Sequence, residues 1–182
     1  ALDGGVAKAA FGGRLDNDGN TAYASGTGAV AEAGSYALNS DDNTARATGP
    51  GSRARAGGGI DTAEISDYPD GNDRNAATAT TGGRAEAGFG GSRNTDNAAT
   101  ASGGATARAG WFGDDNTANS ATASGSALTF ALAGITGDGH DGNVAHALGD
   151  NAIASAGEGG AANDRNMAAA NGEASRAFAG GA

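Results

Sequence analysis

The sequence predicts an all-β protein, a parallel β-solenoid of about seven coils of 22–24 residues, with two sheets packed on a narrow alanine core. Three observations predict this fold. The motif Asn-x-Ala-x-Ala-x-Gly recurs along the chain, alanine alternates with other residues, and a glycine-containing turn follows each alternating stretch. Alternation with a period of two is that of a β-strand. Self-similarity at a period of about 22 residues is typical of a solenoid.

The first strand of each coil is predicted from the motif itself. Its asparagines lie 23, 32, 22, 22, 24 and 23 residues apart, and the long interval holds a loop insertion at 58–74. Six copies share one internal spacing and a seventh, 75–82, has one extra residue. The six are 20–26, 43–49, 97–103, 119–125, 143–149 and 166–172.

The second strand of each coil is predicted from another alternating stretch that follows the turn. These stretches are "AVAEAG" (29–34), "SRARAG" (52–57), "RAEAG" (84–88), "ATARAG" (105–110), "ALTFALAG" (127–134), "AIASAG" (152–157) and "SRAFAG" (175–180). Disorder and a glycine-rich helical bundle are the alternatives. The constant Asn-to-Gly spacing argues against disorder, and a glycine every six to eight residues would break helices.

We expect one domain over 1–182, with an N-terminal half coil and loop at 1–19 and seven coils over 20–180. The stretch "VAKAAFGG" (6–13) has the form of a second strand from a preceding half coil. The chain ends on a coil strand, "SRAFAGGA". Both ends are therefore expected to present open coils that follow the repeat pattern.

The alternation also predicts which side chains are buried. In each strand, every second position is almost always alanine and is expected to face the core. The positions between these alanines vary and are expected to face outward. The first sheet then carries an outer face rich in hydroxyls, and the second sheet is charged in early coils and apolar in later ones. The leading asparagine suits a turn, and stacked asparagines can form a side-chain ladder.

The run "NTARATGPGSRARAG" (43–57) resembles the head-domain repeats of trimeric autotransporter adhesins. It is also similar to the Asn-x-Val-x-Gly coils of grass ice-binding β-rolls. The resemblance covers about 20–180, but the coils here are longer and alanine replaces the branched core residues of both families. It implies a solenoid, with adhesion or ice binding as the associated functions.

Composition excludes several classes of function. The 182 residues include 35 glycines and no cysteine, and the net charge is −10. Without cysteine there is no disulfide framework and no thiolate metal site, and an acidic chain argues against nucleic-acid binding. No apolar run is long enough to span a membrane. The start at Ala1, without Met, predicts a processed protein that is secreted, extracellular or at the cell surface.

The leading functional hypothesis is a structural protein that polymerises with itself, head to tail, into an extracellular filament through its open coil ends. A contiguous apolar patch on the later coils is expected to make a lateral contact. The predicted assembly ends are Val6, Ala7, Ala9, Phe11, Ala177, Phe178 and Ala179. The predicted lateral patch is Leu128, Phe130, Leu132, Val144, Leu148 and Ile153.

Two other hypotheses remain open. An ice-binding protein would use a flat face of Thr44, Thr48, Thr78, Thr80, Thr100, Ser102, Thr122 and Ser124. A calcium-stabilised adhesin or surface-layer segment would bind Ca²⁺ at Asp16, Asp18, Asp138 and Asp141, since carboxylate and backbone oxygens suit Ca²⁺. Turn chemistry alone also explains these aspartates.

No other cofactor and no enzymatic activity are expected. The only histidines are His140 and His146, and neither has a nucleophile at a recognisable spacing.

Overall fold

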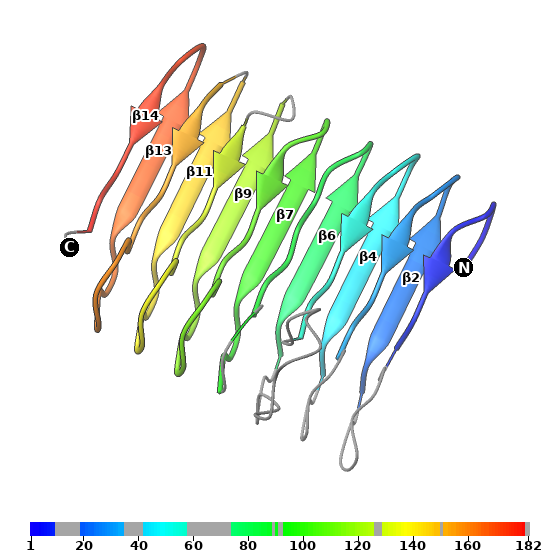
Figure 1. The fold of residues 1–182 in the computed structure, drawn as a ribbon, viewed down its shortest axis with the longest axis horizontal. Helices are drawn as coiled ribbons and strands as arrows, with labels where there is room; N and C mark the ends of the chain where they lie inside the picture. The colour runs from blue at the N-terminus through cyan, green and yellow to red at the C-terminus, as the bar shows by residue number, and fades with distance from the viewer. Residues whose placement is uncertain are drawn as a thin grey trace, which may run out of the picture.

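A computed structural model describes residues 1–9, 19–34, 42–57, 74–88, 90, 93–125, 129–149 and 151–180. All its regular elements are strands, and all strand pairs are parallel. Figure 1 shows the strands stacked side by side along the long axis, with the chain termini at opposite ends. The predicted parallel β-solenoid is therefore confirmed.

The long strands form one seven-stranded sheet in the order β13-β11-β9-β7-β6-β4-β2. Each has five residues and begins directly after the leading asparagine of a repeat, as the motif predicts. They are β2 (Thr21–Ser25), β4 (Thr44–Thr48), β6 (Ala76–Thr80), β7 (Ala98–Ser102), β9 (Ser120–Ser124), β11 (Val144–Leu148) and β13 (Met167–Asn171).

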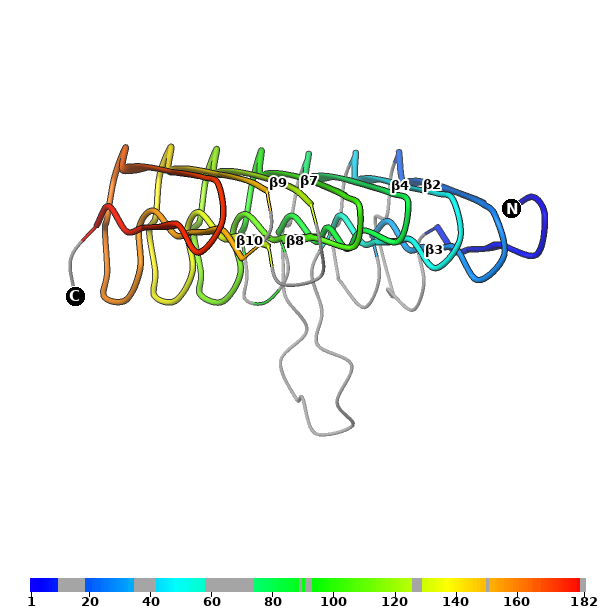
Figure 2. The same ribbon diagram turned by 90° about the horizontal axis from the view of Figure 1, so that it is seen from above.

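The short strands form the opposite side of the coil, seen edge-on in Figure 2. They pair in the orders β1-β3-β5 and β14-β12-β10-β8, and single parallel bridges from Arg84 to Arg53 and to Thr106 join the two groups. They are β1 (Val6–Ala7), β3 (Val30–Ala31), β5 (Arg53–Ala54), β8 (Thr106–Ala107), β10 (Phe130–Ala131), β12 (Ile153–Ala154) and β14 (Arg176–Ala177).

These second strands are shorter than the alternating stretches suggest. The alanine before the closing glycine adopts a positive φ in several coils, for example 74° at Ala109 and 63° at Ala133. This left-handed residue ends the strand and turns the chain.

The structure has about six turns, where the sequence predicts about seven coils. Seven motif copies give seven long strands. A complete turn runs from one long strand to the next, so seven long strands enclose six complete turns. Counting motifs therefore overestimates the number of turns by one.

The core between the two sheets consists of alanine, as predicted. All 28 buried apolar residues are alanines among the residues the structure describes. In β7, for example, Ala99 and Ala101 point inward, while Ala98, Thr100 and Ser102 lie on the outer face. Paired strands place alanine beside alanine, as Ala101 lies beside Ala79 and Ala123. The sheets are thus close enough that only methyl groups fit between them.

We predict that Ala101→Leu lowers the free energy of unfolding by about 3 kcal/mol, because the narrow core cannot take a larger side chain without moving the backbone. Urea denaturation measures the loss. The matched control is Thr100→Val on the outer face of the same strand, which should change stability by about 0.5 kcal/mol or less. Equal stability of the two variants would mean that the core is not close-packed.

Candidate functional site

A column of buried asparagine side chains runs along the inside of one corner of the solenoid. It consists of the leading asparagines of the repeats. The side chain of Asn97 shows the pattern: its backbone N–H and its Nδ2 both donate to Oδ1 of Asn75, at 3.1 and 3.0 Å. Its Nδ2 also donates to the carbonyl of Asn116 in the next coil, at 2.8 Å. The predicted side-chain ladder is therefore present.

The same pattern continues without interruption from Asn75 to Asn166. Oδ1 of Asn119 accepts from Asn143 at 3.1 and 3.0 Å, and Oδ1 of Asn143 accepts from Asn166 at 3.0 and 3.1 Å. Each acceptor belongs to one coil and both donors belong to the next coil toward the C-terminus. The column therefore has a direction.

Glycine at the end of each second stretch leaves room for the column. A Cβ at Gly88 would lie 2.7 Å from the side chain of Asn75, and a Cβ at Gly110 would lie 3.1 Å from Nδ2 of Asn97. The residue before each asparagine has a positive φ, as at Asp96 (58°) and Ala118 (56°). The sequence pattern alone does not explain these closing glycines.

A second polar column was not predicted. Its members are Asn94, Asn116 and His140, all fully buried. Each precedes an asparagine of the first column by three residues in the sequence. The backbone N–H of Asn116 donates to Oδ1 of Asn94 at 3.0 Å, and that of His140 donates to Oδ1 of Asn116 at 3.1 Å. The signal in the sequence is the repeated Asn-x-x-Asn spacing, as in 94–97, 116–119 and 163–166.

The hydroxyl side chains proposed for ice binding do share one face of the long-strand sheet. Thr78, Thr100 and Thr122 are register partners across β6, β7 and β9. A second row, one step along the strands, holds Thr48, Thr80, Ser102 and Ser124, and Oγ of Ser102 lies 3.2 Å from Oγ of Ser124. Thr44 lies in a third row, beside Ala76.

This hydroxyl face is bounded on both sides by larger groups. On one side the guanidinium of Arg46 lies 5.9 Å from the ring centre of Tyr23. On the other side His146 and Leu148 follow Thr122 and Ser124 in register. The uniform part of the face therefore covers β6, β7 and β9, with Thr48 of β4 at its margin.

The outer face of the short-strand sheet carries a row of alternating charges in its first five coils. The row runs Lys8, Glu32, Arg55, Glu86, Arg108, as the strand registers show. Glu32, Arg55 and Glu86 are buried, although their alternation predicts an outward position.

Ion pairs join the first three residues of this row. Oε2 of Glu32 lies 3.8 Å from Nε of Arg55, and Oε1 lies 3.9 Å from Nζ of Lys8. Glu86 pairs with Arg84 of the same coil. Burial lowers the pKa of Arg55, with a further decrease from neighbouring Arg53. Burial likewise lowers the pKa of Arg108 to about 10, and Glu86 offsets only part of this decrease.

The predicted lateral apolar patch is divided between two faces. Phe130 and Ile153 are partners in the short-strand sheet, and Leu132 follows Phe130 by two residues. Val144 and Leu148 lie on the outer face of the long-strand sheet, across the alanine core. These residues do not form one surface, and Leu128 lies outside the described residues.

The aspartates proposed as calcium ligands are only partly described. The carboxylate of Asp138 accepts a hydrogen bond from the backbone N–H of Asp114 at 2.9 Å, and the backbone N–H of Asp141 donates to Asp164 at 3.3 Å. Asp16 and Asp18 lie outside the described residues. No group of three or more His, Cys, Asp or Glu side chains suited to a metal ion occurs in the described part of the chain.

The residues predicted for the assembly ends lie at the two extremes of the short-strand sheet. Val6 and Ala7 of β1 pair with Val30 and Ala31, and Ala177 of β14 pairs with Ala154. Phe178 is 56% exposed and Val6 is 46% exposed. Ala9 and Ala179 flank these strands, and Phe11 lies outside the described residues.

Comparison with known protein families, with curated proteins and with solved structures finds no match to this chain. No family or homologue supports the resemblance to adhesin head repeats or to ice-binding β-rolls. The repeat architecture itself, a parallel β-solenoid, is what the structure establishes. Among the described residues no helix is long and apolar enough to cross a membrane.

We predict that His140→Asn stabilises the protein, because it restores the repeat residue of the second column. Nε2 of His140 lies 3.1 Å from the carbonyl oxygen of Thr136, while Nδ1 is buried without a hydrogen-bond partner. An asparagine Oδ1 would face the next coil at Asn163. The free energy of unfolding should rise by about 1 kcal/mol, measured by urea denaturation.

The control for this change is His140→Ala, which should lower stability because it removes the ring without supplying an amide. If His140→Asn is no more stable than the natural chain, the second column does not favour asparagine at this position.

Proposed function

We propose that this chain is a secreted structural protein that assembles head to tail into an extracellular filament. The observation that carries the proposal is the outer edge of β13. The N–H of Val144 donates to the carbonyl of Asn166, and the N–H of Gly172 donates to the carbonyl of Leu148. In a parallel ladder this alternation leaves the backbone groups of Met167, Ala169 and Asn171 pointing away from β11.

That edge is suited to a further coil of the same kind. No described strand pairs with it, and unpaired strand edges readily accept another strand. Oδ1 of Asn166 accepts no hydrogen bond from the described residues, whereas Oδ1 of Asn143 accepts two from Asn166. A copy stacked in the same direction would continue both the backbone ladder and the asparagine column.

The direction of the column determines the kind of assembly. Acceptors face the C-terminal end, so two copies can continue the column only in the same orientation. Such a heterologous contact does not close on itself and produces a filament.

The first nine residues lie where the C-terminal end of another copy would dock. Leu2 pairs with Ser25, its N–H donates to the carbonyl of Ala24 at 2.8 Å, and β1 covers β3. If β13 of one copy pairs over five residues with β2 of another, β14 of the first copy occupies the level of β1 of the second. Residues 1–9 of the second copy must therefore move aside. In this junction Ala177 and Phe178 meet β3, and Val6, Ala7 and Ala9 belong to the displaced segment.

Negative-stain electron microscopy at increasing protein concentration tests the proposal. We expect filaments with an axial repeat of about 35 Å, which is seven strand spacings. A chain lacking residues 1–9 should assemble at lower concentration. Ala169→Pro should still fold, because proline is tolerated on an edge strand. It should stay dispersed, because it lacks the outward-facing N–H that would pair with another copy.

Single rods of constant length in all three proteins would contradict the proposal. Filaments that come apart only in EDTA would instead support the calcium-stabilised adhesin or surface-layer segment. Immunogold labelling of intact source cells tests the extracellular location.

A second candidate function, ice binding, is favoured by the in-register hydroxyl rows on β6, β7 and β9. In this case the natural chain should show thermal hysteresis, and Thr100→Tyr or Thr122→Tyr should remove it by interrupting the flat rows. Ala169→Tyr lies on the same sheet outside the rows and should leave it unchanged. Absence of hysteresis in the natural chain would exclude this function.

A further inference from the structure

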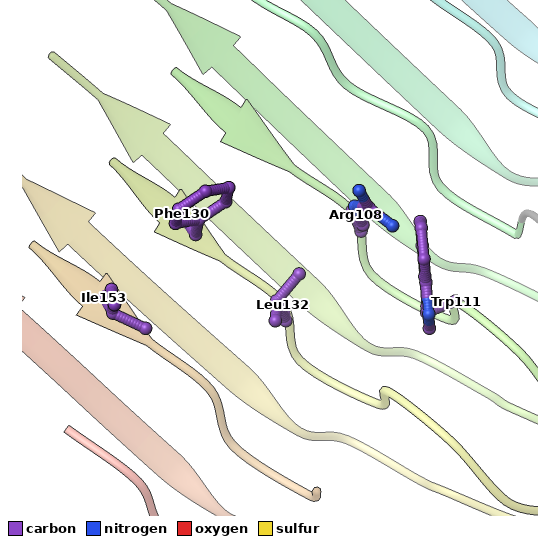
Figure 3. Close-up of a pocket in the computed structure, with 5 residues that line it drawn as sticks. All are labelled: Arg108, Trp111, Phe130, Leu132 and Ile153. Atoms are coloured by element: carbon purple, nitrogen blue, oxygen red, sulfur yellow. The ribbon is translucent and has the colours of Figure 1, made fainter. Parts of the chain in front are cut away.

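A hollow on the short-strand face combines one arginine with apolar walls. Its volume is about 330 Å³, and Arg108, Trp111, Phe130, Leu132 and Ile153 line it. Figure 3 shows Arg108 beside Trp111 at one end, with Leu132, Phe130 and Ile153 extending over the neighbouring coils. The volume lies at the lower end of the range for small-molecule pockets, about 300–1,000 Å³.

The charge row described above ends at this hollow. Signs alternate from Lys8 to Arg108, and each basic residue before Arg108 has an acidic neighbour on its C-terminal side. The register partner of Arg108 in the next coil is Leu132, because Thr106 pairs with Phe130 and Ala107 with Ala131. The position where the alternation requires an acid therefore holds an apolar residue.

The guanidinium of Arg108 is held in place but is not neutralised by a contact. Its Cζ lies 3.1 Å from the ring centre of Trp111, so that one face is stacked. Its Nε is buried without a hydrogen-bond partner. No carboxylate of the described residues lies within 4.0 Å of it, and Glu86 on its other side pairs with Arg84. Partial burial of this cation lowers its pKa, which agrees with a missing counter-charge.

These features specify the ligand. A stacked guanidinium still offers its edge to a planar anion, and a carboxylate fits this edge with two parallel hydrogen bonds. A single cation in an apolar setting suits a monoanion. The apolar walls favour a hydrocarbon body next to the anionic group.

We propose that this hollow binds a small monocarboxylate with an aromatic or aliphatic body. The carboxylate pairs with Arg108 and takes the place of the missing acid in the row. The body lies over Phe130, Leu132 and Ile153. The site is independent of end-to-end assembly, because it lies on the side of the solenoid and not at either end.

Fluorescence titration tests this site directly, because Trp111 is the only tryptophan of the chain. The probes are hexanoate and phenylacetate, each compared with its uncharged amide, hexanamide or phenylacetamide. We expect a saturable change in Trp111 emission with the acids and at least about tenfold weaker binding of the amides. This comparison needs no variant.

Three variants make the test specific. Arg108→Gln should weaken the acids to the level of the amides. Leu132→Glu should abolish binding of the acids by placing a carboxylate beside Arg108, whereas Leu132→Gln, of similar size and uncharged, should retain measurable binding. Circular dichroism confirms that each variant is folded.

Equal affinity for acid and amide, or unchanged acid binding in folded Arg108→Gln, would overturn the proposal. A change that does not saturate would also overturn it.

Discussion

The buried asparagine column is the interaction on which the rest of this structure depends. Alanine methyl groups contribute only about 0.8 kcal/mol each when buried, and the core contains no larger apolar side chain among the described residues. A buried amide without partners costs about 1–3 kcal/mol for each unsatisfied group. From Asn75 to Asn143 every Oδ1 accepts both donors of the next coil. Each coil must therefore bring an asparagine to the same place in the column.

The small residues follow from this column. The glycine behind each asparagine leaves room for the amide, as Gly134 does for Asn119, and the asparagines from Asn75 to Asn143 are fully buried beside the alanine core. The outer positions have no such constraint. They carry hydroxyl rows on one sheet and a charge row on the other, and the charge row ends where Arg108 meets Leu132. Different surfaces can thus share one invariant interior.

The sequence was sufficient to predict the long strands, because a period of two between a fixed asparagine and a fixed glycine admits one local structure. It was not sufficient for features that depend on the path of the chain in space. The positive φ of Ala109 and Ala133 shortens the second strands, and alanine at these positions does not indicate a positive φ. Alternation separates inward from outward residues within a strand, but outward residues form one patch only if they also lie on the same sheet, and Val144 and Phe130 lie on different sheets. The contact of Arg108 with Trp111 depends on the turn between them and could not be predicted from spacing.

The most direct test of the column compares the free energies of unfolding of Asn119→Ala and Ala121→Gly. The first removes the amide that accepts from Asn143, and the second removes one core methyl two residues away. We predict a loss of about 3 kcal/mol or more for Asn119→Ala and about 1–2 kcal/mol for Ala121→Gly. A loss for Asn119→Ala no larger than that for Ala121→Gly would contradict the account, because the alanine core would then be the main source of stability.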